Sequence, residues 1–143
     1  VDKSLAEKIS KVYSVTVNSA PGADGRFMRV SIDYYSPENN LRYKTINDFI
    51  AKVTAKAAGV DAVFSKPQAV KVGGRSARAF VESSAEFRPP DSADAKKMPV
   101  RTRYVCVPAK EGFFVLKFRA DSALYSANSG IFQTVLKSFV PLK

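Results

Sequence analysis

Residues 100–119 set the architecture that the sequence predicts, and they read VRTRYVCVPAKEGFFVLKFR. Segments 100–107 and 113–119 are rich in β-branched and aromatic residues, which favour strands. The five residues between them, PAKEG, combine proline and glycine, which is typical of a turn. The pattern therefore predicts an antiparallel hairpin whose turn is centred on Lys110.

Positive charge is concentrated in this hairpin and in the segment just before it. A turn centred on Lys110 would place Arg103 opposite Lys117. The same register pairs Arg101 with Arg119, so that all four cations lie on one side, turned away from the core. Like charges directly opposite each other destabilise a sheet, so a compensating group is expected there. We name as candidate binding residues the cations Arg101, Arg103, Lys117, Arg119, Lys96 and Lys97.

Three sources of that compensation are open. Glu82 and Glu86 share one face of a long strand predicted over residues 75–87, so they can neutralise the basic side if this strand is a neighbour. A bound anion or a partner protein would serve equally well. The loop predicted over residues 88–99 is polar and bounded by prolines, so we include it in the predicted contact surface.

The remaining strands and a first helix follow from residue pattern. Strands are predicted over residues 12–18 and 27–35, joined by a turn rich in proline and glycine. A helix begins near Thr45, where Asp48 completes a capping-box pattern, and Gly59 suits its C-terminal end. Its apolar residues recur at helical spacing, which predicts one face packed against the sheet.

A second helix follows Asp121 and Ser122, either of which can serve as its N-cap. It is predicted to end before Pro141, because proline cannot continue a helix. Its apolar side is predicted to comprise Leu124, Asn128, Ile131, Phe132, Val135, Leu136 and Phe139.

Two helices and about five or six strands predict one α+β domain over residues 1–143, with an antiparallel sheet packed against helices. Residues 1–11 fit either a helix or a trimmed strand and loop. Because the chain starts at Val1 without a methionine, we expect a trimmed mature chain that lacks an N-terminal targeting segment. No apolar run approaches the ~20 residues of a membrane span.

Composition excludes several classes of enzyme. The 143 residues include no histidine and one cysteine. This removes Ser-His-Asp and Cys-His catalysis, zinc sites of the usual ligands and an internal disulfide. Glu82 and Glu86 would lie ~13 Å apart along their strand, too far for the paired carboxylates of a glycosidase. Cys106 alternates with Tyr104 and Thr102 on a predicted core face, which favours a buried thiol. We therefore expect no enzyme activity, no cofactor and no metal site.

The net charge is the one feature that suggests nucleic acid. The chain has 23 Lys and Arg against 13 Asp and Glu, a formal charge of +10. No RNA-binding aromatic motif, helix-turn-helix signal or zinc finger accompanies this charge. Nucleic acid or another polyanion is therefore kept as the alternative partner, behind a protein partner.

Four short motifs, three of them in the C-terminal half, form a set that can be compared with known families. The segment VGGRSA at residues 72–77 leads into a strand, and GFFVL at residues 112–116 begins the last one. The closing helix carries Phe132, Val135, Leu136, Ser138 and Phe139, and the pair Tyr34–Tyr35 ends an early strand. Together these motifs resemble the PsbP-like superfamily. That superfamily includes the photosystem II extrinsic protein, the Ran-binding Mog proteins and many exported bacterial proteins or lipoproteins.

The resemblance implies an α/β/α sandwich with a central, mainly antiparallel sheet and a binding or assembly role without catalysis. We accordingly expect an extracytoplasmic domain of the bacterial cell envelope, periplasmic or lipid-anchored, that contacts a protein or an anionic envelope component. No binding motif of the superfamily matches this sequence residue by residue, so the candidate site depends on charge alone.

Overall fold

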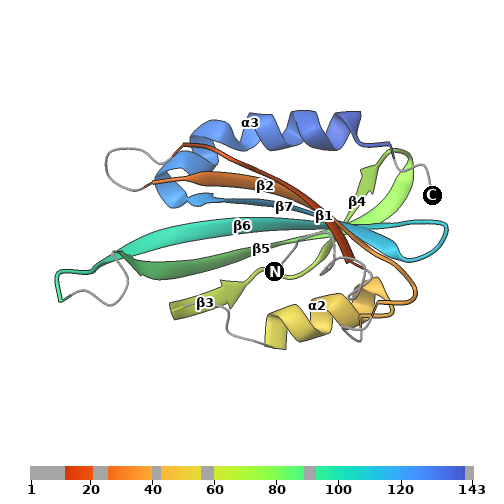
Figure 1. The fold of residues 1–143 in the computed structure, drawn as a ribbon, viewed down its shortest axis with the longest axis horizontal. Helices are drawn as coiled ribbons and strands as arrows, with labels where there is room; N and C mark the ends of the chain where they lie inside the picture. The colour runs from red at the N-terminus through yellow and green to blue at the C-terminus, as the bar shows by residue number, and fades with distance from the viewer. Residues whose placement is uncertain (1–11, 21–25, 40–42, 56–59, 89–92, 141–143) are drawn as a thin grey trace.

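The computed structural model describes residues 12–20, 26–39, 43–55, 60–88 and 93–140. Within these ranges the chain forms seven strands and two helices (Figure 1). The elements in chain order are β1 (Val12–Asn18), β2 (Met28–Tyr35), α2 (Ile46–Ala55), β3 (Val60–Phe64), β4 (Gln68–Val72), β5 (Arg75–Arg88), β6 (Lys96–Pro108), β7 (Phe113–Asp121) and α3 (Ser122–Ser138).

All seven strands belong to one antiparallel sheet. Its order is β1-β2-β7-β6-β5-β3, and β4 pairs with β5 beside β3. The predicted hairpins β1–β2 and β6–β7 are both present, and β2 joins them by pairing with β7. The α+β class is therefore confirmed. Within the described residues, neither helix has both the length and the apolar character needed to cross a membrane.

The two helices pack on opposite faces of the sheet, which we call the α3 face and the α2 face (Figure 1). On the α3 face, Phe132 and Leu136 bury their side chains against alternate residues of β6 and β7. The rings of Phe132 and Phe118 stack with their centroids 5.7 Å apart. Ile131, which was predicted to share this apolar side, is 50% exposed, so that assignment was wrong.

On the α2 face, Phe49 and Ile50 pack into an aromatic cluster near the β6–β7 turn. The predicted capping box is present, because the Asp48 amide donates to Thr45 Oγ1 at 3.1 Å and the Thr45 amide donates to Asp48 Oδ2 at 3.2 Å. Since α2 has only ten residues, it covers one end of the sheet. The other end of this face carries mainly polar side chains.

The register of the β6–β7 hairpin differs from the predicted one by one residue. Pro108 pairs with Phe113, so four residues form the turn, and its centre lies between Lys110 and Glu111. The Ala109 amide donates to the Gly112 carbonyl at 3.2 Å, and Gly112 has a φ of 73°. A shift of one residue reverses which side chains of the two strands share a face.

This register separates the four cations that were predicted to lie together. Arg103 is opposite Phe118, and Lys117 is opposite Tyr104. Arg101 and Arg103 therefore lie on the α3 face, whereas Lys117 and Arg119 lie on the α2 face. The prediction of a single basic side was wrong.

Three further parts of the chain can be compared with what the sequence predicted: the loop after β5, the segment before residue 75, and the two ends. The loop expected over residues 88–99 is shorter, because β6 already begins at Lys96. Pro99 pairs with Ala85 of β5, and β6 meets β7 only from Val100 onward, so the missing amide of this proline costs no ladder bond. The segment between the first helix and residue 75 contains two strands, β3 and β4, that were not predicted. Residues 1–11 and Pro141 lie outside the described ranges.

Candidate functional site

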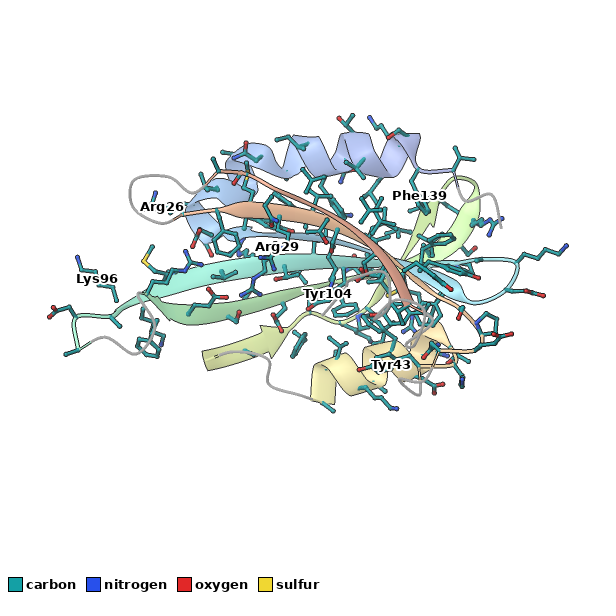
Figure 2. All side chains as sticks on the ribbon, in the orientation of Figure 1. Arg26, Arg29, Tyr43, Lys96, Tyr104 and Phe139 are labelled. Carbon is teal, nitrogen blue, oxygen red and sulfur yellow. The ribbon has the colours of Figure 1, made fainter. Side chains whose placement is uncertain are left out.

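The six predicted site residues occupy three places. Arg101, Arg103 and Lys97 follow one another on the α3 face of β6, and Lys117 and Arg119 lie on the α2 face of β7. Lys96 is exposed at the start of β6, at the far end of the long β5–β6 hairpin (Figure 2). The structure therefore contains two distinct charged surfaces instead of one.

The first surface is a hollow on the polar end of the α2 face, which we call the polar cavity. It has a volume of about 480 Å³ and draws its walls from β2, β5, β6 and β7. Arg29 and Tyr104 lie on the middle of the sheet, between Lys96 at one end and Tyr43 beside α2 (Figure 2). Its lining residues are Phe27, Arg29, Ser31, Glu86, Thr102, Tyr104, Lys117 and Arg119.

Acidic neighbours neutralise the two predicted cations of this cavity. Arg119 pairs closely with Glu86 and lies 4.0 Å from Glu82 Oε1. Lys117 Nζ lies 3.4 Å from Asp33 Oδ2. Arg119 is therefore compensated by the predicted acids Glu82 and Glu86, whereas Lys117 is compensated by Asp33, which was not among the predicted groups.

Burial shifts the pKa values of Glu82 and Arg119. Glu82 is only 1% exposed, and burial raises the pKa of its carboxyl while Arg119 acts in the opposite direction. Burial lowers the pKa of the Arg119 guanidinium, and nearby Arg29 adds to this while Glu82 opposes it. Oε2 of Glu82 is buried and has no hydrogen-bond partner among the described residues.

Asp121 anchors the edge of the polar cavity instead of capping α3 through its side chain. It occupies the N-cap position but makes no side-chain capping bond. One oxygen accepts the Phe27 amide at 2.7 Å, and the other accepts Arg88 Nη1 at 2.6 Å. Arg88 also pairs with Glu86 at 3.0 Å. The carboxylate predicted as a possible cap thus joins β7 to β5 and to the residue before β2.

The second surface follows β6 beside α3, and we call it the basic stripe: Lys97, Arg101, Arg103 and Lys137. The Arg101 guanidinium lies over the Tyr125 ring at 5.9 Å, and that of Arg103 lies over the Phe132 ring at 5.8 Å. Lys97 and Arg101 line a hollow of about 380 Å³. Arg103 and Lys137 line another of about 460 Å³.

Charge is divided unequally between the two faces. All acidic residues of the sheet whose side chains the structure describes lie on the α2 face: Asp33, Glu82, Glu86 and Asp121. Helix α3 contains no acidic residue at all. Arg101 and Arg103 of the basic stripe therefore have no described carboxylate as a neighbour, whereas the cations of the α2 face are largely balanced.

The thiol and the acidic side chains of the described residues are the groups to consider for a nucleophile or a metal site. Burial raises the pKa of the Cys106 thiol to about 12, so the thiolate is scarce at neutral pH. Among the described residues, no three His, Cys, Asp or Glu side chains are grouped to hold a metal ion. What both surfaces can do is bind charged or polar molecules.

Arg29, which lines the polar cavity, and Asp33, which pairs with Lys117 beside it, were not among the predicted site residues. Arg29 lies opposite Arg119, and Asp33 lies opposite Val115, in the pairing of β2 with β7. The two strands are far apart in the sequence, so no local pattern indicates this pairing. The alternation of charged with apolar residues in segment 28–35 was the only available signal.

Comparisons with known proteins concern the fold. No family model matches the sequence. No curated protein matches it either. Among solved structures, the chain is similar to PA94, a protein of unknown function from Pseudomonas aeruginosa, with a TM-score of 0.65 and 10% sequence identity. The similarity covers 92% of this chain and 84% of that chain, and it supports the α+β architecture alone.

Proposed function

We propose that this chain is a non-enzymatic binding domain of the bacterial cell envelope that uses the basic stripe to contact an acidic protein surface. The proposal includes a PsbP-like α/β/α sandwich and an extracytoplasmic location. The helices on opposite faces of an antiparallel sheet support the first, and the resemblance of the sequence motifs supports the second.

The unequal division of charge carries this proposal. On the α2 face each sheet acid whose side chain the structure describes has a basic neighbour, which is the arrangement of an internally balanced surface. On the α3 face, Arg101 and Arg103 interact with aromatic rings and with no carboxylate of the described residues. Cations held in place but not neutralised attract an anionic partner.

Apolar residues beside the basic stripe favour a protein as that partner. Val63, paired with Ser83, is 66% exposed, and Phe87, paired with Lys97, is 48% exposed. Both pairs lie on the α3 face. Protein interfaces combine apolar contacts with a polar rim, whereas affinity for a polyanion depends mainly on cations.

The test compares two variants with the same change in net charge. Arg101→Glu/Arg103→Glu reverses the basic stripe, and Lys66→Glu/Lys110→Glu reverses two exposed lysines elsewhere. Each protein is used to capture partners from a bacterial envelope extract, and a candidate identified by mass spectrometry is purified and rebound. We expect the stripe variant to lose at least about tenfold in affinity, ~1.4 kcal/mol, and the control to bind like the wild type.

The outcome that contradicts the proposal is equal binding by both variants, or equal loss by both. Retention on heparin or an oligonucleotide, weakening steeply with salt, would instead favour the polyanion alternative. Circular dichroism of each variant establishes that the fold is retained.

A further inference from the structure

Strand β1 stands at one end of the sheet order, and among the described strands it pairs with β2 alone. Tyr13, Val15 and Val17 alternate along this strand and are 43%, 65% and 66% exposed. Val15 and Val17 lie opposite Ile32 and Val30 of β2, which pack against the core of the α3 face. The apolar α3 side of the sheet therefore continues onto a strand whose own side chains are largely exposed.

β1 lacks the features by which proteins protect an edge strand. Its sequence, VYSVTVN, contains no charged residue and no proline. Its seven residues pair with β2 in one continuous register, without a bulge. Charged side chains, prolines, bulges and short length are the devices that keep an exposed edge from pairing with another chain. A regular, uncharged edge of seven residues is therefore suited to accept a further strand.

The strand at the opposite end of the sheet does have these features. β3 has five residues and includes Asp61, and its register with β5 shifts between Val60 and Val63. Val63 of β3 is 66% exposed, almost the same fraction as Val15 of β1. The two edges thus expose valine to the same extent, but only β3 combines this exposure with a charge, a register shift and short length.

The residues of β1 match a second copy of the same strand. In an antiparallel pair with a twofold axis through Val15, the two Val15 side chains are neighbours and each Tyr13 is opposite Val17. On the other face Ser14 is opposite Thr16, so polar residues meet polar residues. Pairs of aromatic with β-branched residues are favourable across strands. Such an interface uses the same patch on both partners, as closed twofold dimers do.

Charge favours this place of contact between two copies. Each chain has a formal charge of +10, so two copies repel each other. The side chains that β1 and β2 place on the α3 face are all uncharged: Tyr13, Val15, Val17, Met28, Val30, Ile32 and Tyr34. Contact along β1 therefore joins two positively charged chains without placing like charges directly opposite each other on this face.

Tyr13 is held in position before any partner strand arrives. Its ring stacks on that of Tyr34, with the centroids 6.4 Å apart. Tyr34 packs on Phe114 at 4.9 Å, and its hydroxyl donates to the Glu111 carbonyl at 2.7 Å. Phe114 in turn contacts Phe139 at 5.2 Å. A side chain that is already ordered loses little conformational entropy when a partner binds.

We propose that two copies of this chain associate through β1, in an antiparallel pair centred on Val15 that joins their sheets edge to edge. One strand from each copy forms a small interface, so the dimer is weak. Salt strengthens it, because salt screens the repulsion between the two chains. This inference does not depend on the proposed function, since the basic stripe lies on β6 and α3.

Sedimentation equilibrium of the full chain tests the association from about 10 μM to about 1 mM, in 20 and 300 mM sodium chloride. We expect the average mass to rise with concentration from 15.6 kDa toward twice that value. The rise should begin at a lower protein concentration in the higher salt.

Two matched lysine variants locate the interface. Val15→Lys places two lysines next to each other at the twofold axis and should weaken the dimer at least about tenfold. Val63→Lys makes the same change at the equally exposed valine of the other edge strand, and it should dimerise like the wild type. Circular dichroism of both variants establishes that the fold is retained.

A cysteine variant tests the register without a change of charge. Val15→Cys brings two thiols together at the axis, so oxidation by copper phenanthroline should give a covalent dimer. Val63→Cys, oxidised in the same way, should stay monomeric. Cys106 is fully buried and is present in both variants, so it does not account for a difference between them.

The proposal is overturned if the mass stays at 15.6 kDa throughout, or if Val15→Lys and Val63→Lys have equal effects. It is also overturned if Val15→Cys cross-links no better than Val63→Cys. A chain that is monomeric alone but loses a partner from envelope extract on Val15→Lys would show that a strand of another protein occupies β1 instead. Arg101→Glu/Arg103→Glu should still dimerise, so failure of either proposal leaves the other standing.

Discussion

Arg119 and Arg101 have the same side chain and lie on neighbouring strands, but their surroundings differ. Arg119 lies among Glu82, Glu86 and Thr102 and is partly buried. Arg101 lies exposed over the ring of Tyr125, with no carboxylate of the described residues beside it. An arginine paired inside a polar network mainly holds strands together, whereas an unpaired one at the surface is open to a partner.

Glu82→Gln should change how stability depends on pH. The pKa of Glu82 is raised by burial, so the folded protein binds this proton more tightly than the unfolded one. That contribution stabilises the wild type at pH values below the unfolded pKa and is lost as pH rises through the folded pKa. The glutamine variant does not titrate, so we expect its stability relative to wild type to be greater at pH 8 than at pH 4.

Urea unfolding of both proteins at pH 4, 6 and 8 measures this difference. Glu111→Gln, which removes an exposed carboxylate, is the control and should show a smaller change. If the stability of Glu82→Gln relative to the wild type instead falls between pH 4 and pH 8, the ion pair with Arg119 has a larger effect on the pKa of Glu82 than burial has.

Cys106 should be inert in the folded protein. It is fully buried in the core of the α2 face, and burial raises the pKa of its thiol to about 12. We expect no reaction with a disulfide reagent at pH 8 until the protein is unfolded in guanidinium, when one thiol should react. Fast reaction under native conditions would contradict the packing described around this residue.

The turn between β6 and β7 controls which side chains of the two strands share a face. Gly112 has a φ of 73°, and a Cβ built there would clash with the Tyr35 carbonyl oxygen, a backbone atom at the end of β2. The turn is therefore restricted by its own backbone and by the next strand of the sheet. Only glycine satisfies both requirements.

Alanine substitutions at three glycines should have graded effects. Gly112→Ala should destabilise the protein by more than ~2 kcal/mol, because backbone must move. Gly74→Ala, at a φ of 76° in open space, should cost ~1 kcal/mol. Gly130→Ala, in α3 and in open space, should stabilise by ~0.5–1 kcal/mol. Urea unfolding measures all three, and equal effects at Gly112 and Gly74 would refute the contact with Tyr35.

The helices were predicted more completely than the strands. Thr45 and Asp48 form the expected capping box because its bonds join residues three apart. The short strands β3 and β4 were missed because Pro67 interrupts the segment that contains them, and their partner in both cases is β5. Pairing between distant segments leaves a weak local signal.

The described acidic residues of the sheet lie on the α2 face, and the basic stripe lies on the α3 face. A formal charge of +10 opposes the compact state through self-repulsion, which salt screens. The partly buried ion pairs of the α2 face are screened less. Net repulsion should therefore dominate the response of the protein to salt.

Thermal unfolding should shift to higher temperature when sodium chloride rises from 20 to 300 mM at pH 7. Scanning calorimetry measures the shift. Arg101→Glu/Arg103→Glu, which lowers the net charge, should reduce it. A midpoint that falls with salt would show that ion pairs contribute more than the repulsion.

The sequence by itself determined the α+β class, the two main hairpins, the capping box of α2 and the burial of Cys106, because each of these follows from residue type or short-range spacing. The placement of the cations depended on tertiary structure. A shift of one residue in the register of the β6–β7 hairpin changes which side chains of β6 and β7 share a face. Arg29 and Asp33 come from β2, which pairs with β7 although the two strands are far apart in the sequence. Register and long-range pairing follow from packing of the whole sheet, so the separation into a polar cavity and a basic stripe is a property of the folded molecule.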